Sequence, residues 1–392
     1  MVPLNISDRR ERLLVRAADL VLTPARLRRR PRPTTAPRSI LCLRLERIGD
    51  LLMALPALAE LRAAAASSEI DLVVGSWNAE IARAIPGLRR VEVLDAAWLA
   101  RGGAGHSLPS LAVRARRWKQ RRYDVAINFE PDIRSNAIAA AAGAGWTAGF
   151  ASGGGGALLD LALPFDATLH TSENLTALVR EVTRGWSTES TPANVRLQLD
   201  DEERRRAAAR LADLGSPIVA MHVNGGRAIK QWPVDRFAAV ARWLANERHA
   251  SLVFTGSQDD RAAIDAVRSA LGGTPSLDVS GVGLVQAAAI VERCDLLVTG
   301  DTGPMHLAHA VGCPVVAVFG PSDPRRYAPR GPRDRVVRVD LPCAPCNRIR
   351  QPPSRCVGHT PDCLSGVSVA AVISAIADVI GGSSGNRIST VA

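Results

Sequence analysis

The segment at residues 296–324, LLVTGDTGPMHLAHAVGCPVVAVFGPSDP, decides the fold that this sequence predicts. An apolar run at 296–299 leads into a Gly-Asp-Thr-Gly turn, a short helical stretch at 304–311 and a second apolar run at 314–319. This order predicts a strand, a helix and a second strand. Parallel sheets bind ligands at the carboxyl ends of their strands, and free amides at a helix start favour an anion such as a pyrophosphate. The segment therefore predicts a phosphate-binding edge.

The same alternation of strands and helices runs through the rest of the chain. Apolar strand patterns with helical stretches between them occur at residues 39–45, 69–74, 91–94, 125–128, 217–222 and 251–256. This alternation is typical of α/β domains with parallel sheets, and 392 residues are enough for two of them. We predict a basic tail at 1–38, Rossmann-like domains at 39–195 and 196–380, and a flexible tail at 381–392.

Composition indicates a globular protein. Hydrophobic residues make up 47% of the chain and charged residues 22%, and no apolar run is long enough to span a bilayer. The first residues do not resemble a secretory signal, so we expect a cytoplasmic protein. Only 4% of residues are aromatic and no zinc-finger or RNA-recognition pattern occurs, which argues against a nucleic-acid partner.

The positive charge is concentrated in the tail. Residues 1–38 carry ten arginines and three carboxylates, a net +7 of the chain's +11. Within the tail, Leu13, Leu14, Ala17, Leu20 and Val21 recur at helical spacing. One interpretation is a helix lying on an anionic membrane surface, and the other is a helix packed on the protein with a solvated basic linker. The sequence favours neither.

Asp50 is the first candidate for chemistry, because the Gly49-Asp50 pair follows the first predicted strand. A carboxylate at such a turn can accept a proton from an attacking hydroxyl as a general base. Aspartate is also a preferred helix N-cap. The local pattern favours the cap.

Cationic residues follow the predicted strand at 217–222. Arg227 and Lys230 lie in a glycine-containing loop and can neutralise a diphosphate leaving group. The alternative is an exposed basic loop anchored by Trp232. Gly256 ends the next strand, where it either lines a nucleotide pocket or forms a simple turn.

The turn at the centre of the deciding segment supplies four further candidates. Thr302 and Gly303 can present a hydroxyl and backbone amides to phosphate. Asp301 can hold sugar hydroxyls, and His306 lies one turn into the helix. A capped helix with a core histidine is the alternative.

Four of the seven cysteines cluster late in the chain, at Cys343, Cys346, Cys356 and Cys363. One C-x-x-C pair with two further cysteines suits a structural zinc ion. Free thiols are the alternative, and disulfides are not expected in a reducing cytoplasm.

Taken in order, these stretches resemble glycosyltransferase family 9, the heptosyltransferases of lipopolysaccharide core synthesis. The resemblance rests on ILCLRLERIGDLLMALPALAELR, IKQWPVDRFAAVARWL and DTGPMHLAHAVGCPVVAVFGPSDP, and it extends to the late cysteines. It implies a GT-B fold of two Rossmann-like domains and an inverting sugar transfer. Asp50 would be the catalytic base, Lys230 would bind the donor phosphates, and Asp301, Thr302, Gly303 and His306 would form the donor motif.

The resemblance also implies the substrates. ADP-heptose is the expected nucleotide-sugar donor, and a lipid-linked glycan at the cytoplasmic face of the inner membrane is the expected acceptor. We expect no cofactor: the chain has no Asp-x-Asp triplet, a common way to hold a metal on a sugar nucleotide. Glu46 and Arg47 stand where family members often have serines. A sugar-nucleotide epimerase and a non-catalytic nucleotide-sugar-binding protein are the alternatives.

Overall fold

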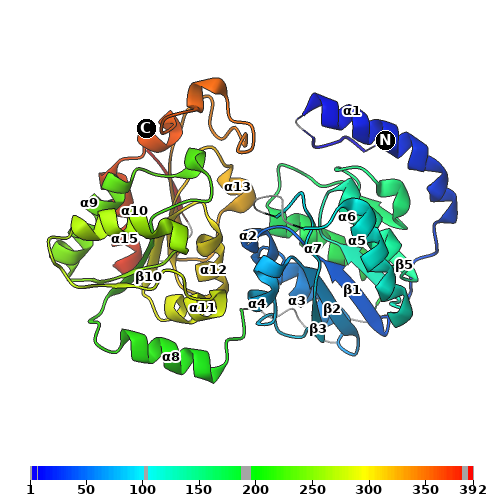
Figure 1. The fold of residues 1–392 in the computed structure, drawn as a ribbon, viewed down its shortest axis with the longest axis horizontal. Coiled ribbons are helices and arrows are strands. Elements are labelled where there is room, and N and C mark those ends of the chain that lie inside the picture. The colour runs from blue at the N-terminus through cyan, green and yellow to red at the C-terminus, as the bar shows by residue number, and fades with distance from the viewer. Residues whose placement is uncertain (1, 7, 101–104, 187–195, 382–386, 392) are drawn as a thin grey trace. The chain divides into compact units, whose positions relative to one another are not determined.

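The protein is described here by a computed structural model that covers residues 2–6, 8–100, 105–186, 196–381 and 387–391. The chain divides into two compact units, Met1–Arg196 and Leu197–Ala392. Each unit is built around its own sheet (Figure 1).

The first unit has a parallel sheet of six described strands in the order β3-β2-β1-β4-β5-β6. The strands are β1 Ser39–Leu43, β2 Glu69–Val74, β3 Arg90–Val93, β4 Val125–Asn128, β5 Trp146–Phe150 and β6 Leu161–Leu163. Its helices are α1 Arg9–Leu22, α2 Ile48–Leu52, α3 Leu55–Ala64, α4 Ala79–Ala82, α5 Leu108–Ala115, α6 Ile133–Ala141 and α7 Thr171–Val182, with short 3-10 turns at η1 Thr23–Arg28, η2 Ser76–Asn78, η4 Arg116–Arg121 and η5 Gly156–Leu158.

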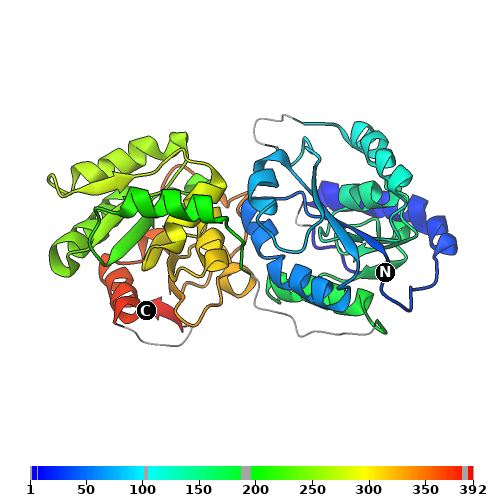
Figure 2. The same cartoon turned by 90° about the horizontal axis from the view of Figure 1, so that it is seen from below.

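The strands of this sheet are apolar because helices cover both faces. Helices α3 and α7 pack together on one face, and α5 and α6 on the other (Figure 2). In β1, Ile40, Leu41, Cys42 and Leu43 are fully buried. Helices α2 and α3 are separate, and Pro56 stands in the first turn of α3, where its missing N–H costs nothing.

The N-terminal segment packs on the first unit. Asp8 caps α1 by accepting a hydrogen bond from the Glu11 amide at 2.8 Å. Beyond the helix, Arg30 pairs with Asp160 at 2.7 Å, and Arg32 pairs with Glu181 at 2.6 Å. These contacts attach residues 1–38 to the first unit, and they pair arginines of the basic linker with carboxylates instead of leaving them only solvated.

The second unit has a parallel sheet of seven described strands in the order β13-β12-β11-β10-β7-β8-β9. The strands are β7 Ile218–His222, β8 Ser251–Phe254, β9 Ser276–Asp278, β10 Leu296–Gly300, β11 Val315–Val318, β12 Arg335–Val339 and β13 Arg387–Val391. Its helices are α8 Asp201–Leu211, α9 Val234–Arg248, α10 Arg261–Ser269, α11 Leu284–Glu292, α12 Gly303–Val311, α13 Pro324–Tyr327, α14 Asp362–Ser365 and α15 Val369–Ile380, with 3-10 turns at η6 Ala228–Lys230, η7 Gln258–Asp260 and η8 Ser354–Cys356.

The deciding segment occupies the centre of this second sheet. Strand β10 lies between β11 and β7, with Thr299 opposite both Ala317 and His222. Because all three strands are parallel, the residues that follow β7 and β10 meet at one edge.

Part of the predicted C-terminal tail is a strand. Within residues 381–392, expected as a flexible tail, residues 387–391 form β13, which pairs in parallel with β12 and places Val337 opposite Ser389. The β-branched residues of this stretch suit a strand, and β12 supplies the free edge. Within the described residues, no helix is both long and apolar enough to cross a membrane.

Trp232 should be a major source of stability in the second unit. Its ring is 1% exposed and stacks edge-on against Phe237, and its Nε1 donates to the Val367 carbonyl at 3.0 Å. We expect Trp232→Ala to lower the free energy of unfolding by about 3–5 kcal/mol, measured by urea titration. Trp243→Ala, at a half-buried ring on α9, is the control. Equal losses in the two variants would contradict this role.

Candidate active site

An ion pair joins the two loops that follow β7 and β10. Lys230 Nζ lies 2.7 Å from Asp301 Oδ2, and the two side chains are 22% and 8% exposed. Within the described residues, Asp301 Oδ2 accepts no aligned hydrogen bond, so the contact is one of close opposite charges. Lys230 is also one of only two lysines among 49 basic residues, the other being Lys119. The ion pair holds the Lys230 ammonium at the edge of the sheet, and the ammonium can still donate hydrogen bonds to a ligand.

The start of α12 lies beside this pair. Thr302 is the N-cap, with extended backbone, but no side chain of the described residues caps the helix. The Thr302 hydroxyl instead lies 3.0 Å from the Thr299 hydroxyl. The first amides of α12, from the half-buried Gly303 onward, are thus left for an anion.

His306 is buried one turn into α12, 8% exposed. Burial lowers its pKa to about 4, a fall that the Asp301 carboxylate opposes and Lys230 reinforces. The imidazole is therefore neutral at pH 7. It can exchange hydrogen bonds with a ligand but adds no positive charge to the site, and its burial is that of a core histidine.

Arg227 and Gly256 lie in the loops after β7 and β8, which are neighbours in the sheet. The Arg227 side chain is exposed and, among the described residues, makes no ion pair. A Cβ on Gly256 would approach the Asp260 Cβ to 2.9 Å. Gly256 is needed for this close packing, and its carbonyl accepts from the Gly281 amide at 2.8 Å.

Asp260 is a supporting residue that the sequence interpretation missed. Its carboxylate accepts from Asn224 Nδ2 and from the Ser257 amide, each at 2.6 Å, and so ties the loop after β7 to the loop after β8. Burial favours a higher pKa, but the hydrogen bonds from Ser257 and Asn224 outweigh it and lower the pKa of Asp260. A Ser-x-x-Asp capping pattern was the available signal.

Asp50 lies in the first unit, in the first turn of α2. It is not the N-cap: that residue is Arg47, whose amide donates to Asp50 Oδ2 at 3.2 Å. The other oxygen lies 3.7 Å from Arg44 Nη2, and the side chain is 29% exposed. Asp50 thus supports the helix start from inside its first turn and keeps a carboxylate accessible.

Two buried ionisable residues hold the loop that carries Asp50. Arg44, 2% exposed, donates to the backbone carbonyls of Asp50 at 3.0 Å and Phe129 at 2.8 Å, and it pairs with Glu46 at 2.9 Å. Glu130 is 1% exposed and accepts hydrogen bonds from the amides of Leu45 and Glu46. Burial first, and then the Glu46 charge, raise the pKa of Glu130 to about 8.

The structure thus brings Lys230, Asp301, Thr302, Gly303 and His306 together in the second unit. Arg227 and Gly256 follow neighbouring strands at the same edge. Asp50 belongs to the first unit.

The late cysteines are all unpaired thiols, from the exposed Cys343 to the buried Cys363. Burial, followed by the neighbouring Cys346 and Cys356, raises the pKa of Cys363 to about 11, which keeps it protonated. No group of three or more potential ligands in the described residues is arranged to hold a metal. The structural zinc therefore stays a prediction.

Comparison with known proteins identifies the family. A model of glycosyltransferase family 9 (heptosyltransferase) matches residues 113–355. The chain belongs to glycosyltransferase family 9. The predicted family and enzyme class are confirmed.

Relatives of this family 9 enzyme include curated proteins and solved structures. Lipopolysaccharide core heptosyltransferase OpsX of Haemophilus influenzae is 22% identical over 78% of this chain and 86% of its own length. Lipopolysaccharide heptosyltransferase 2 of Salmonella typhimurium is 34% identical over 28% of this chain and 32% of its own.

Solved structures agree with the fold. The family 9 glycosyltransferase of Veillonella parvula superposes with a TM-score of 0.74 at 23% identity, over 88% of this chain and 98% of that one. The structure of E. coli ADP-heptose LPS heptosyltransferase II superposes with a TM-score of 0.68 at 19% identity. The match covers 87% of this chain and 98% of that one. The predicted GT-B fold of two Rossmann-like domains is confirmed.

Glu130 should make stability depend on pH. Its raised pKa means that the folded protein holds a proton that the unfolded chain releases, so the free energy of unfolding should fall as pH rises from about 4.5 to about 8. Glu130 contributes at most about 1.4 kcal/mol per pH unit to the slope of the unfolding free energy against pH. In Glu130→Gln this part of the slope should vanish, as measured by urea titrations across the range.

Glu80→Gln, at an exposed carboxylate of the same unit, is the matched control and should keep the wild-type slope. A Glu130→Gln protein with an unchanged slope would show that Glu130 is ionised in the folded state throughout the range.

Proposed function

We propose that this family 9 enzyme transfers a heptose from ADP-heptose to a lipopolysaccharide-core or other lipid-linked glycan, with inversion at the anomeric carbon. The observation that carries the proposal is the Lys230–Asp301 pair at the uncapped start of α12. Relatives named for lipopolysaccharide heptosyl transfer support the choice of donor and acceptor.

The donor would bind along the edge of the second sheet. Its diphosphate would be bound by the ammonium of Lys230, the guanidinium of Arg227 and the first amides of α12. Together these groups would stabilise the charge of the departing ADP. The Asp301 carboxylate would accept hydrogen bonds from sugar hydroxyls. The neutral His306 imidazole would add a hydrogen bond without further charge, and Gly256 would let the nucleotide approach the loop after β8.

Asp50 would act as the general base. Its carboxylate would take the proton of the acceptor hydroxyl while that oxygen forms its bond to the anomeric carbon, and the bond from this carbon to the diphosphate would break. Arg44 holds the backbone at Asp50, and Glu130 holds the two amides that precede this turn. These contacts would fix the backbone of this turn while the side chain of Asp50 stays accessible.

We further propose that transfer needs no metal ion or cofactor. The sequence has no Asp-x-Asp triplet, and Lys230, Arg227 and the first amides of α12 would provide the charge that a metal would otherwise supply. The enzyme would work in the cytoplasm, at the inner face of the membrane that carries its acceptor.

Substitutions of Asp50 and of Lys230 should impair different steps, sugar transfer in the first case and donor binding in the second. Asp50→Asn should slow transfer by about a hundredfold to ten-thousandfold while ADP-heptose binding stays near wild type, measured by chromatographic product assay and calorimetry. Lys230→Ala should weaken ADP-heptose binding about tenfold or more, because it removes a charge-assisted contact. Lys119→Ala removes the chain's other lysine and is the control.

Transfer by Asp50→Asn at the wild-type rate would refute the base assignment. Tight donor binding by the wild type with no transfer to any lipid-linked acceptor would favour a non-catalytic binding protein.

Metal removal should leave the reaction intact. Transfer rates measured with and without EDTA should agree, because the diphosphate is neutralised by protein cations. Strong inhibition by EDTA that added Mg²⁺ reverses would overturn the metal-free mechanism.

A further inference from the structure

Helix α1 lies on the first unit by one narrow face. Val15 is its only buried residue, 8% exposed. One turn on, Asp19 accepts a hydrogen bond from the Gly155 amide at 2.6 Å. Nearer the chain start, the Asn5 amide donates to the Ser152 carbonyl at 2.8 Å. This attachment orients the opposite face of α1 toward solvent.

That opposite face is apolar. Leu13, Leu14, Leu20 and Val21 are 56%, 71%, 73% and 79% exposed, and Leu27 in η1 reaches 91%. On a helical wheel these four residues of α1 fall on one side together with Ala17. Of the nine large hydrophobic side chains exposed in the described residues, five belong to this stretch. An apolar cluster of this kind marks an interaction surface rather than chance exposure.

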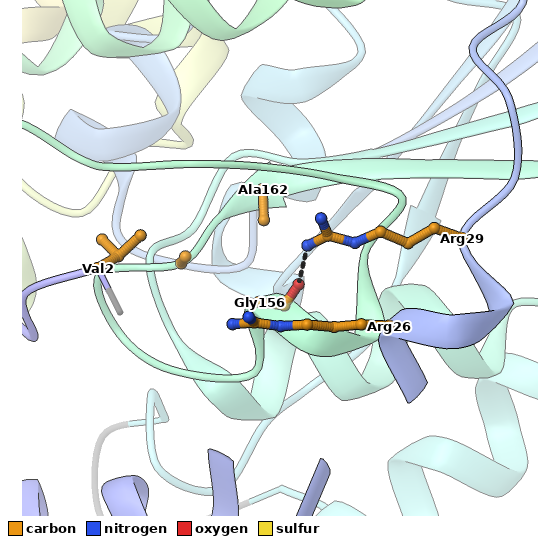
Figure 3. Close-up of a pocket in the computed structure, with 6 residues that line it drawn as sticks. Val2, Arg26, Arg29, Gly156 and Ala162 are labelled. Carbon is orange, nitrogen blue, oxygen red and sulfur yellow. Dashed lines mark hydrogen bonds between the residues drawn. The ribbon is translucent and has the colours of Figure 1, made fainter. Parts of the chain in front are cut away.

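Positive charge borders the apolar face. Arg9, Arg10, Arg16 and Arg28 are exposed, and among the described residues none of them forms an ion pair. Arg26 and Arg29 line a hollow of about 340 Å³ between η1 and the η5 region, together with Val2, Ala151, Gly156 and Ala162 (Figure 3). Arg29 Nη2 donates to the Gly156 carbonyl at 3.4 Å.

We infer that α1 and η1 form a docking surface for an anionic lipid bilayer. The exposed leucines and Val21 would enter the boundary between headgroups and acyl chains, and the arginines would meet lipid phosphates. The hollow between Arg26 and Arg29 would hold one headgroup phosphate. A second copy of the chain would bring the same positive charges to the same face, which opposes self-association there.

The surface specifies the membrane contact that the proposed function requires for a lipid-linked acceptor. Binding to vesicles involves no sugar transfer, so the docking surface and the proposed reaction can fail separately.

Flotation of the full chain with phosphatidylcholine vesicles, with and without phosphatidylglycerol, tests the apolar face. Leu14→Glu/Val21→Glu should lower affinity for the phosphatidylglycerol vesicles about tenfold or more, because it places charge where the helix enters the membrane. Val113→Glu/Leu169→Glu alters two exposed apolar side chains elsewhere in the same unit and should bind as the wild type does.

The arginines need a separate pair of variants. Arg26→Ala/Arg29→Ala should weaken binding about fivefold for each charge removed, whereas Arg210→Ala/Arg242→Ala, at exposed arginines of the second unit, should not. Thermal unfolding checks that each variant is folded.

Three results would overturn the docking surface. These are wild-type affinity in the Leu14→Glu/Val21→Glu protein, equal binding to vesicles with and without phosphatidylglycerol, or a dimer in sedimentation velocity that this variant dissociates. The last would assign the face to a second copy of the chain.

Discussion

The site in the second unit depends on one electrostatic constraint, the pairing of Lys230 with Asp301. Asp301 follows the central strand with its side chain 8% exposed, and a buried carboxylate without a cation is costly. Lys230 meets that requirement from the neighbouring strand's loop. The pair therefore fixes both the path of the chain before α9 and the position of the α12 start. A diphosphate entering this edge would share a cation that is already in place, so little reorganisation would be needed on binding.

Each unit supports its loop with a carboxylate that comes from elsewhere in the chain. Glu130 follows β4 and accepts hydrogen bonds from two backbone amides of the loop after β1. Asp260 follows β8 and accepts a hydrogen bond from the Asn224 side chain in the loop after β7. The two carboxylates differ electrostatically. Burial dominates at Glu130 and raises its pKa, whereas hydrogen bonds dominate at Asp260 and lower its pKa. The same topology thus gives one loop anchor that is protonated near neutral pH and one that stays ionised.

The sequence predicted β10, α12 and β11 well, because apolar runs and a Gly-Asp-Thr-Gly turn mark their ends locally. The family resemblance assigned Lys230 and Asp301 to one donor site, and the structure pairs them at one edge of the second sheet. The missed features are non-local. Strand β13 depends on pairing with β12. Glu130 accepts hydrogen bonds from backbone amides 84 and 85 residues earlier in the chain. At Asp50, residue type alone could not distinguish a helix N-cap from the first turn of α2, where the structure places it.

The scarcity of lysine has a practical consequence. Forty-seven of the 49 basic residues are arginines, whose guanidinium groups are not acylated under conditions that modify lysine amines. Acylation of side-chain amines is thus limited to Lys119, which is exposed, and Lys230, which is half-buried against Asp301. Mass spectrometry of the two acylated peptides would therefore compare a reference amine with the site amine in one experiment. Lys119 thus serves as an internal reference, and a change in the acylation of Lys230 relative to Lys119 would report a ligand bound at the loop after β7.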